Sequence, residues 1–264
     1  MQMTSSFVPA LAKIGHTFTL FLEGTGRLAL FTGRAIGSIF QPPFYARQLW
    51  RQIVDIGYFS LPVVGLTCAF SGMVLALQSY TGFARFSAEG AVANVVVLSM
   101  TRELAPVLAG LMVAGRIGAA MAAELGTMRV TDQIDALTTL STNPMKYLVA
   151  PRILAGLLML PLLVLVGDVI GVFGGFIICV YKLGFNPASY IKSSWDFLQF
   201  NDVFSGLVKA GVFGFIVTLM GCYNGYNSRG GAQGVGTATT NAVVSASIMI
   251  LIANYIITEF FFAH

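Results

Sequence analysis

Five stretches of this chain are long enough and apolar enough to cross a lipid bilayer. They run over about residues 56–84, 91–123, 148–181, 203–226 and 237–262. A spanning helix needs about 20 mostly apolar residues, because its backbone polar groups must be satisfied inside the helix. Only 10% of all residues are charged and 56% are hydrophobic, which is too apolar for a soluble domain of this length. The sequence therefore predicts an all-α integral membrane protein with five spans.

The N-terminal segment differs from these spans because charges interrupt its apolar residues. Five ionisable residues are spread through residues 7–40, namely Lys13, His16, Glu23, Arg27 and Arg34. This pattern is typical of a helix that lies in the membrane interface. Gln41-Pro42-Pro43 then breaks the chain before a short helix with Arg47 and Arg51. We expect interfacial and elbow helices over residues 1–55 and a five-span domain over residues 56–264.

A polar insert, about residues 124–147, separates spans two and three and is longer than a simple turn requires. We expect a short amphipathic helix inside it, capped by Thr131 and ended by Asn143-Pro144. Its apolar face would carry Val130, Ile134, Leu137 and Leu140, and Asp132, Gln133 and Asp135 would cover the rest. On shape alone, this helix is either a docking element for another protein or an interfacial loop helix without a partner.

The chain lacks the sequence patterns of an ATPase or of common hydrolases. It contains no Gly-Lys pair, so it has no phosphate-binding loop, and neither G-x-S-x-G nor H-E-x-x-H occurs. Cys68, Cys179 and Cys222 lie inside apolar runs without C-x-x-C spacing. We therefore expect no enzyme, no metal and no cofactor in this chain. The net charge of +4 is dispersed, so we also expect no nucleic-acid partner.

Four of the charged residues inside predicted spans are candidates for a functional role, namely Arg102, Glu103, Arg116 and Asp168. Such charges are costly in a bilayer and usually face a cavity or a partner. The two adjacent residues point about 100° apart on a helix, so each should meet a different group. Both a headgroup-binding cavity and interhelical ion pairs remain open for this first pair. Ion pairing is the favoured interpretation for the other two.

Small residues recur at four-residue spacing in two spans. They are Gly110, Ala114 and Gly118 in span two, and Gly167, Gly171 and Gly175 in span three. Such stripes allow helix backbones to approach closely in lipid. We expect packing within the chain rather than a seam between two copies.

The distribution of cationic residues predicts the orientation in the membrane. Nine of them fall on the N-terminal side of the spans: Lys13, Arg27, Arg34, Arg47, Arg51, Arg129, Lys146, Arg152 and Arg229. Three fall on the other side: Arg85, Lys182 and Lys192. Cytoplasmic loops carry the excess of Lys and Arg. We therefore expect a cytoplasmic N-terminus and insert, and a C-terminus on the outer face.

Ordered motifs over nearly the whole chain closely resemble the MlaE family, the permease subunits of bacterial phospholipid-trafficking ABC transporters. The motifs are Gly72–Gln78, Arg102–Val107, Ala114–Gly118, Glu124–Leu137, Asn143-Pro144, Tyr147–Arg152 and Asn224–Tyr226. The resemblance implies a homodimer in the bacterial inner membrane. Its partners would be a cytoplasmic ATPase that holds ATP and Mg²⁺, a STAS-domain regulator and a ring of MCE-domain lipid carriers.

The resemblance also implies roles for individual residues. Two copies would enclose an outward-facing lipid cavity lined by Leu77, Tyr80, Arg102, Glu103 and Asn254. Asn254 stands where some relatives are expected to have an acidic residue. The ATPase would contact Glu124, Arg129, Asp132, Gln133, Ile134, Asp135 and Leu137. The expected function is phospholipid movement between the inner membrane and a periplasmic MCE carrier, which maintains the lipid asymmetry of the outer membrane.

Two other function classes remain possible from the residues. An ion-coupled secondary transporter or channel could use Glu103, Arg116 and Asp168, although the sequence has no visible inverted repeat and no matched pair of broken helices. A structural scaffold for the carrier ring would need no nucleotide-driven change. Copurification of a nucleotide-binding subunit would favour the ABC permease.

Overall fold

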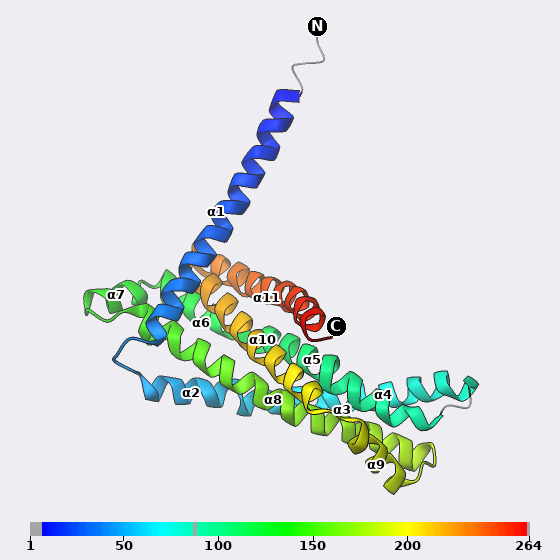
Figure 1. The fold of residues 1–264 in the computed structure, drawn as a ribbon. Coiled ribbons are helices and arrows are strands. Elements are labelled where there is room, and N and C mark those ends of the chain that lie inside the picture. The colour runs from blue at the N-terminus through cyan, green and yellow to red at the C-terminus, as the bar shows by residue number, and fades with distance from the viewer. Residues whose placement is uncertain (1–6, 87–88, 263–264) are drawn as a thin grey trace.

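The structure is a computed structural model that describes residues 7–86 and 89–262, and over these residues it contains helices and no strand (Figure 1). The α-helices are α1 (Phe7–Ile39), α2 (Ala46–Ile56), α3 (Leu61–Phe83), α4 (Val92–Ser99), α5 (Ala105–Val113), α6 (Ala119–Val130), α7 (Gln133–Thr139), α8 (Ala150–Ile177), α9 (Pro187–Phe197), α10 (Phe200–Tyr226) and α11 (Gly231–Phe262). Four π-helical segments adjoin them: Met100–Leu104, Ala114–Gly118, Met145–Val149 and Ile178–Lys182. Short 3₁₀ turns cover Tyr58–Ser60, Ala84–Phe86 and Glu89–Ala91.

Within the described residues, five continuous helical runs are long and apolar enough to span a membrane. They are Ala46–Phe83, Val92–Val130, Met145–Lys182, Phe200–Tyr226 and Gly231–Phe262. The predicted multi-pass, all-α architecture is therefore confirmed. The first run begins earlier than expected, because a single 3₁₀ turn joins the elbow helix α2 to α3. Among these runs, α10 is the most buried and α11 the least.

The N-terminal helix α1 is continuous and extends away from the bundle in Figure 1. It is not one of the five candidate spans. Its C-terminal half packs on the bundle, where the Phe31 ring lies 5.4 Å from that of Tyr223 and 5.9 Å from that of Tyr226, centroid to centroid. The charges that interrupt this helix fit its absence from the candidate spans.

Glycines bring the long helices into close contact. A Cβ atom on Gly72 of α3 would collide with the carbonyl of Gly171 on α8, and one on Gly214 of α10 would collide with the carbonyl of Gly156 on α8. Gly171 belongs to the small-residue stripe of span three, which packs inside the chain as expected. The stripe of span two also faces α10, where Gly110 contacts Phe213. Close backbone approach of this kind replaces the missing hydrophobic driving force in lipid.

The polar insert is folded differently from the expectation. Helix α6 continues through Val130, and the chain breaks at Asp132, whose φ of 59° is left-handed. Thr131 does not cap α7, because its hydroxyl donates to the Thr127 carbonyl in the preceding turn. Asn143 does not end α7 either. Its Oδ1 accepts the amide hydrogen of Met145 at 3.0 Å, so it caps the start of span three, and Pro144 takes the favoured first-turn position.

Candidate functional site

The site begins with a π-helical segment, Met100–Leu104, that interrupts span two and carries Arg102 and Glu103. Pro106 lies two residues beyond this segment and has no amide hydrogen for the Arg102 carbonyl one turn earlier. That carbonyl instead accepts a hydrogen bond from Lys209 Nζ at 2.9 Å. Glu103 lies roughly 16 Å along the helix from Val92, at about 1.5 Å per residue. The segment therefore places two charges well inside the apolar layer.

Helix α10 supplies the partners of both charges from one face. Asp202, Gly206 and Lys209 follow each other at helical spacing on this face. A Cβ atom on Gly206 would collide with the Thr101 carbonyl, so glycine allows α10 to approach the π-helical segment. Arg102 donates to Asp202 Oδ1 from Nε at 2.8 Å and from Nη2 at 2.6 Å. Lys209 Nζ lies 2.6 Å from Glu103 Oε1.

The last three turns of α11 complete the cluster. The Asn254 amide donates to Glu103 Oε2 at 2.9 Å, and the Thr258 hydroxyl donates to Glu103 Oε1 at 3.0 Å. One turn further, the Phe262 ring centroid lies 4.2 Å from the Arg102 guanidinium carbon. An acidic residue at position 254 would repel Glu103, whereas an amide can donate to it. The expected proximity of Arg102, Glu103 and Asn254 is therefore present in the structure.

The four charged side chains of this cluster differ in how exposed they are. The side chains of Asp202 and Lys209 are 1% and 0% exposed, whereas those of Arg102 and Glu103 are 32% and 36% exposed. Asp202 is fixed further because it also accepts the Gln199 amide hydrogen at 3.0 Å as part of a capping box. Buried partners thus orient one guanidinium and one carboxylate that reach the surface of the chain.

The sequence prediction omits three members of this cluster, namely Asp202, Lys209 and Thr258. One signal for the first two was present, because a carboxylate and an amine seven residues apart lie on the same face of a helix. A lysine inside an apolar span is itself a functional candidate. No comparable signal marks Thr258, since an intramembrane threonine commonly bonds its own backbone, and this one also donates to the Asn254 carbonyl.

Two other predicted cavity residues lie on α3, away from the charged cluster. Tyr80 and Leu77 are half-buried near the C-terminal end of this helix. The Tyr80 ring packs edge-on against Phe185 at 5.9 Å between centroids. Among the described residues, neither side chain forms a hydrogen bond or ring contact with Arg102, Glu103 or Asn254. The five-residue cavity therefore stays a prediction.

The favoured interpretation of Arg116 and Asp168 as ion-paired residues is wrong within the described part of the chain. Arg116 Nη1 donates to the Asp55 carbonyl at 3.1 Å and to the Ser60 hydroxyl at 2.8 Å, which ties span two to the elbow. Asp168 has no cationic partner among the described residues, and its Oδ1 is buried without a hydrogen bond. The opposite charges of Arg116 and Asp168 therefore did not predict the groups that these side chains contact.

The residues expected to contact an ATPase form two groups at the other end of the bundle. Glu124 accepts from the buried Arg152 Nη2 at 2.8 Å, which joins α6 to α8. Arg129 Nη1 lies 2.6 Å from Asp135 Oδ1, and this pair holds α7 next to α6. Asp132 and Gln133 are exposed at the start of α7.

The apolar face of α7 requires a correction. Ile134 is only 1% exposed and is covered by its own chain, so it cannot insert into a partner in this conformation. Leu137 is half-buried against the same core, whereas Leu140 is 74% exposed. The sequence pattern identified the apolar residues but not the surface that covers them. A partner of α7 would therefore meet its polar face and Leu140.

No group of three or more His, Cys, Asp or Glu side chains that could hold a metal occurs in the described residues. The three cysteines are buried as free thiols. The cluster of Arg102, Glu103, Asp202 and Lys209 has equal numbers of positive and negative groups.

Comparisons with known proteins agree with this architecture. The family model described as "Permease MlaE" matches residues 49–260. A "Probable ABC transporter permease protein" of Rickettsia felis is 59% identical over 250 residues, which cover 95% of this chain and 96% of the relative. The "Intermembrane phospholipid transport system permease protein MlaE" of Haemophilus influenzae is 36% identical over 265 residues, 98% of this chain and 99% of the relative. The chain thus belongs to the MlaE family and is a permease, the non-catalytic membrane subunit of an ABC transporter.

Proposed function

We propose that this permease moves phospholipids and that Arg102 and Glu103 receive the headgroup. The observation that carries the proposal is the exposure of these two charges inside a span while their partners Asp202 and Lys209 are buried. A guanidinium binds phosphate oxygens well, and a carboxylate accepts from hydroxyl or ammonium groups. The name of the Haemophilus relative, which includes phospholipid transport, supports the same substrate class.

A homodimer would turn this exposed surface into a cavity. Helix α11 is the least buried span and carries exposed apolar side chains such as Val244, Ile248 and Tyr255. A second copy packed along α11 and α3 would enclose Arg102 and Glu103 and bring Leu77 and Tyr80 toward the same space. Dimers of identical chains related by a two-fold axis are the commonest soluble homo-oligomers. A transporter in which each of two permease copies binds one ATPase would have the same two-fold symmetry.

The motor would dock on the surface around α7. A polar concavity of about 280 Å³ beside this helix is lined by residues that include Arg129, Asp132, Asp135 and Arg229. We place the ATPase here, with ATP and Mg²⁺ on that subunit. A STAS-domain regulator and a ring of MCE-domain carriers would complete the complex. The excess of cationic residues on this side supports an inner-membrane location with α7 in the cytoplasm and the C-terminus in the periplasm.

The mechanism follows from the position of the two sites at opposite ends of the bundle. ATP binding would draw the two copies of α7 together and shift the dimer toward a state with a smaller outer cavity. The lipid headgroup would then lose its place beside Arg102 and Glu103. Lipid would then leave the cavity toward the carrier. The same ATP cycle could also move lipid in the opposite direction, from the carrier into the cavity.

The test is lipid movement between carrier and liposome by the reconstituted complex, with and without ATP. Glu103→Arg would place two cations side by side and remove the acceptor of Asn254 and Thr258. We expect ATP-dependent lipid movement to fall by at least tenfold while the complex still assembles. Glu259→Arg is the matched control, since this exposed carboxylate lies on α11 next to Thr258.

Three results would contradict the proposal. Normal lipid movement by an assembled Glu103→Arg complex would remove the headgroup role of this cluster. Lipid movement that needs an ion gradient and no nucleotide would favour a secondary transporter, and a complex without any nucleotide-driven movement would favour a scaffold.

A further inference from the structure

Arg116 is a charged residue of span two that the proposed function does not use. It belongs to the π-helical segment Ala114–Gly118 and lies roughly 21 Å further along span two than Arg102, at about 1.5 Å per residue. By the same measure it lies roughly 36 Å from Val92, where span two begins, whereas the hydrocarbon layer of a bilayer is about 30 Å thick. Arg116 therefore lies at the headgroup level of the leaflet on the α7 side, and Arg102 lies toward the opposite leaflet.

Exposed aromatic side chains mark the same level of the membrane. The 3₁₀ turn Tyr58–Ser60 joins the elbow helix α2 to α3, and Tyr58 and Phe59 in this turn are 70% and 51% exposed. Amphipathic aromatic rings such as tyrosine are enriched where a membrane meets water. The Arg116 guanidinium carbon lies 5.9 Å from the Phe59 ring centroid. This cation and the aromatic turn therefore lie at one depth.

Two contacts with the elbow fix the orientation of the Arg116 guanidinium. Its Nη1 donates to the Asp55 carbonyl at 3.1 Å and to the Ser60 hydroxyl at 2.8 Å, so both hydrogens of this atom are used. Asp55 contributes its backbone carbonyl to this contact, and its half-buried carboxylate forms no ion pair with Arg116. An unattached arginine near the interface would extend toward water. This one is held against the elbow instead, so the plane of its guanidinium is set.

The opposite edge of this guanidinium has no partner among the described residues. Nε and Nη2 of Arg116 form no hydrogen bond or ion pair there, and neither atom is buried, in contrast to the covered Nε of Arg152. In Arg102 the same two atoms bind the Asp202 carboxylate. The Nε and Nη2 edge of an arginine matches two oxygens of a carboxylate or phosphate. Arg116 therefore presents an accessible, oriented pair of donors for an oxyanion.

The surface of span two beside Arg116 is open toward the membrane centre. Met112 lies one helical turn nearer to that centre and is 38% exposed. Gly115 is also exposed, and a Cβ atom on it would meet no neighbouring group within 4 Å. An acyl chain can lie against this surface while its phosphate reaches the guanidinium.

We propose that Arg116 binds the phosphate of a phospholipid in the α7-side leaflet through Nε and Nη2, with an acyl chain along Gly115 and Met112. Phosphate is the recognised group because it supplies the negative charge and the paired oxygens that this edge does not find in its own chain. Every phospholipid carries that group, so the site selects phospholipid over a neutral lipid with the same acyl chains. The site is separate from Arg102 and Glu103 and does not depend on the proposed transport function.

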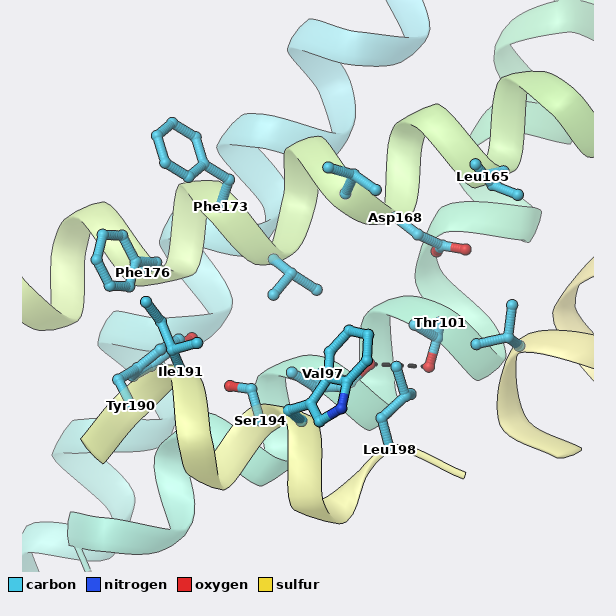
Figure 2. A pocket seen from close by; sticks show the side chains of 14 residues that line it. Val97, Thr101, Leu165, Asp168, Phe173, Phe176, Tyr190, Ile191, Ser194 and Leu198 are labelled. Atoms are coloured by element: carbon cyan, nitrogen blue, oxygen red, sulfur yellow. Dashed lines mark hydrogen bonds between the residues drawn. The ribbon is translucent and has the colours of Figure 1, made fainter. Parts of the chain in front are cut away.

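An apolar groove on the bundle surface provides a comparison within the same molecule. It lies between α8 and α9, has a volume of about 440 Å³ and is lined by side chains such as Phe173 and Phe176 (Figure 2). Its described lining includes no lysine or arginine, so the groove has no cationic partner for a phosphate. Acyl chains should contact it whatever their headgroup.

Site-specific photocrosslinking tests the proposal. A photoreactive amino acid replaces Met112 or, for comparison, Phe173 in the full-length permease, purified with its partners in phosphatidylcholine nanodiscs without ATP. The nanodiscs contain equal traces of tagged phosphatidylcholine and tagged diacylglycerol with the same acyl chains. At position 112 we expect capture of phosphatidylcholine to exceed that of diacylglycerol by roughly tenfold, since one hydrogen bond to a charged group is typically enough for that factor. At position 173 we expect no such preference.

Substitutions of Arg116 identify the group that binds the phosphate. In Arg116→Gln the preference at position 112 should disappear. In Arg116→Lys it should be partly retained, because an ammonium keeps the charge but not the paired donors. Arg47→Gln is the matched control, since Arg47 is an exposed cation on the neighbouring helix α2. The comparison of positions 112 and 173 needs no change of Arg116, so it decides the proposal even if Arg116→Gln does not fold.

The proposal fails under any of three outcomes. Equal capture of both lipids at position 112 would mean that Arg116 does not select a phosphate. A preference that survives in folded Arg116→Gln would assign the selection to another group. Loss of the preference in an excess of inorganic phosphate would assign the site to a free anion and not to a lipid. Capture is read without ATP and without transport, so failure here leaves the function of the charged cluster untouched.

Discussion

Lys209 links Glu103 and Arg102 within the charged cluster. Its Nζ donates to the Glu103 carboxylate and to the Arg102 carbonyl that Pro106 leaves without a helical donor. A lysine inside a span is costly unless both its charge and its hydrogen-bonding capacity are satisfied. The residue therefore belongs to the site as a positioning group for Arg102 and Glu103.

Removal of the Lys209 ammonium should destabilise the permease. Lys209→Met leaves the Glu103 carboxylate and the Arg102 carbonyl without their common donor, at a cost of about 1–3 kcal/mol. The loss should be smaller than for a fully buried pair, because Glu103 reaches the surface. The unfolding midpoint in mild detergent measures it. Addition of Glu103→Gln should recover part of the loss, and Lys192→Met, at an exposed position of α9, should have no effect. Strictly additive losses in the double variant would mean that Glu103 and Lys209 do not interact.

Gly206 should tolerate no side chain. In Gly206→Ala the new Cβ atom collides with the Thr101 carbonyl and pushes α10 from the π-helical segment, which should cost about 1–3 kcal/mol of stability. Gly211→Ala on the same helix is the control, since its Cβ would meet only Pro161, at 3.9 Å. Because alanine has a higher helix propensity than glycine, the stability of Gly211→Ala should be unchanged or slightly higher. Equal unfolding midpoints for the two alanine variants would refute the close approach at Gly206.

At the scale of elements, two π-helical segments carry charged side chains of span two that contact neighbouring helices. Met100–Leu104 carries Arg102 and Glu103, and Ala114–Gly118 carries Arg116, whose guanidinium reaches the elbow. Single π-helical turns inside α-helices frequently mark functional sites, because they redirect side chains at some cost in backbone hydrogen bonding. Span two therefore links the charged cluster to the elbow and, through α6, to α7.

Two substitutions in or next to α7 should separate binding of the ATPase from folding of the permease. Leu140→Asp changes an exposed side chain, so it should weaken copurification of the ATPase and leave the unfolding midpoint of the permease unchanged. Ile134→Ala creates a cavity inside the chain and should lower stability by about 2–5 kcal/mol. Full ATPase recovery with Leu140→Asp would move the docking surface away from α7.

At the scale of the whole molecule, the five spans form one bundle with α10 in the centre and α11 at an edge. The charged cluster and α7 lie near opposite ends of this bundle. Such an arrangement suits a permease, because rigid helices can carry a change at the motor surface to a distant cavity. The lipid-facing α3 and α8 also expose many apolar side chains, as expected for helices in contact with acyl chains.

The orientation of the bundle can be tested with single cysteines. Leu140 and Tyr181 are 74% and 83% exposed and lie near opposite ends of span three, while the three native cysteines are buried. A membrane-impermeant maleimide that reaches the periplasm should label Tyr181→Cys in cells whose inner membrane is intact. Leu140→Cys should react only after that membrane is permeabilised. The opposite pattern would place α7 in the periplasm and exclude it as a motor contact.

The sequence alone determined the membrane architecture and the family. A bilayer requires long apolar segments, so the five spans follow from composition along the chain, and the ordered motifs carried the resemblance that the family model bears out. It also determined that Arg102 and Glu103 meet different partners, because adjacent helical residues point in different directions. Helical periodicity could not show that Ile134 is covered by its own chain, since an apolar face carries no information about what packs on it.

Only the tertiary structure decided how the charged cluster is assembled. Asp202 lies 100 positions from Arg102 in sequence, and Asn254 lies 151 positions from Glu103. The local sequence sets the helix face on which each side chain lies. It does not set how the neighbouring helix is rotated or how far along the bundle it is placed. Those depend on close contacts such as Gly206 against Thr101, and on the interruption of span two ahead of Pro106.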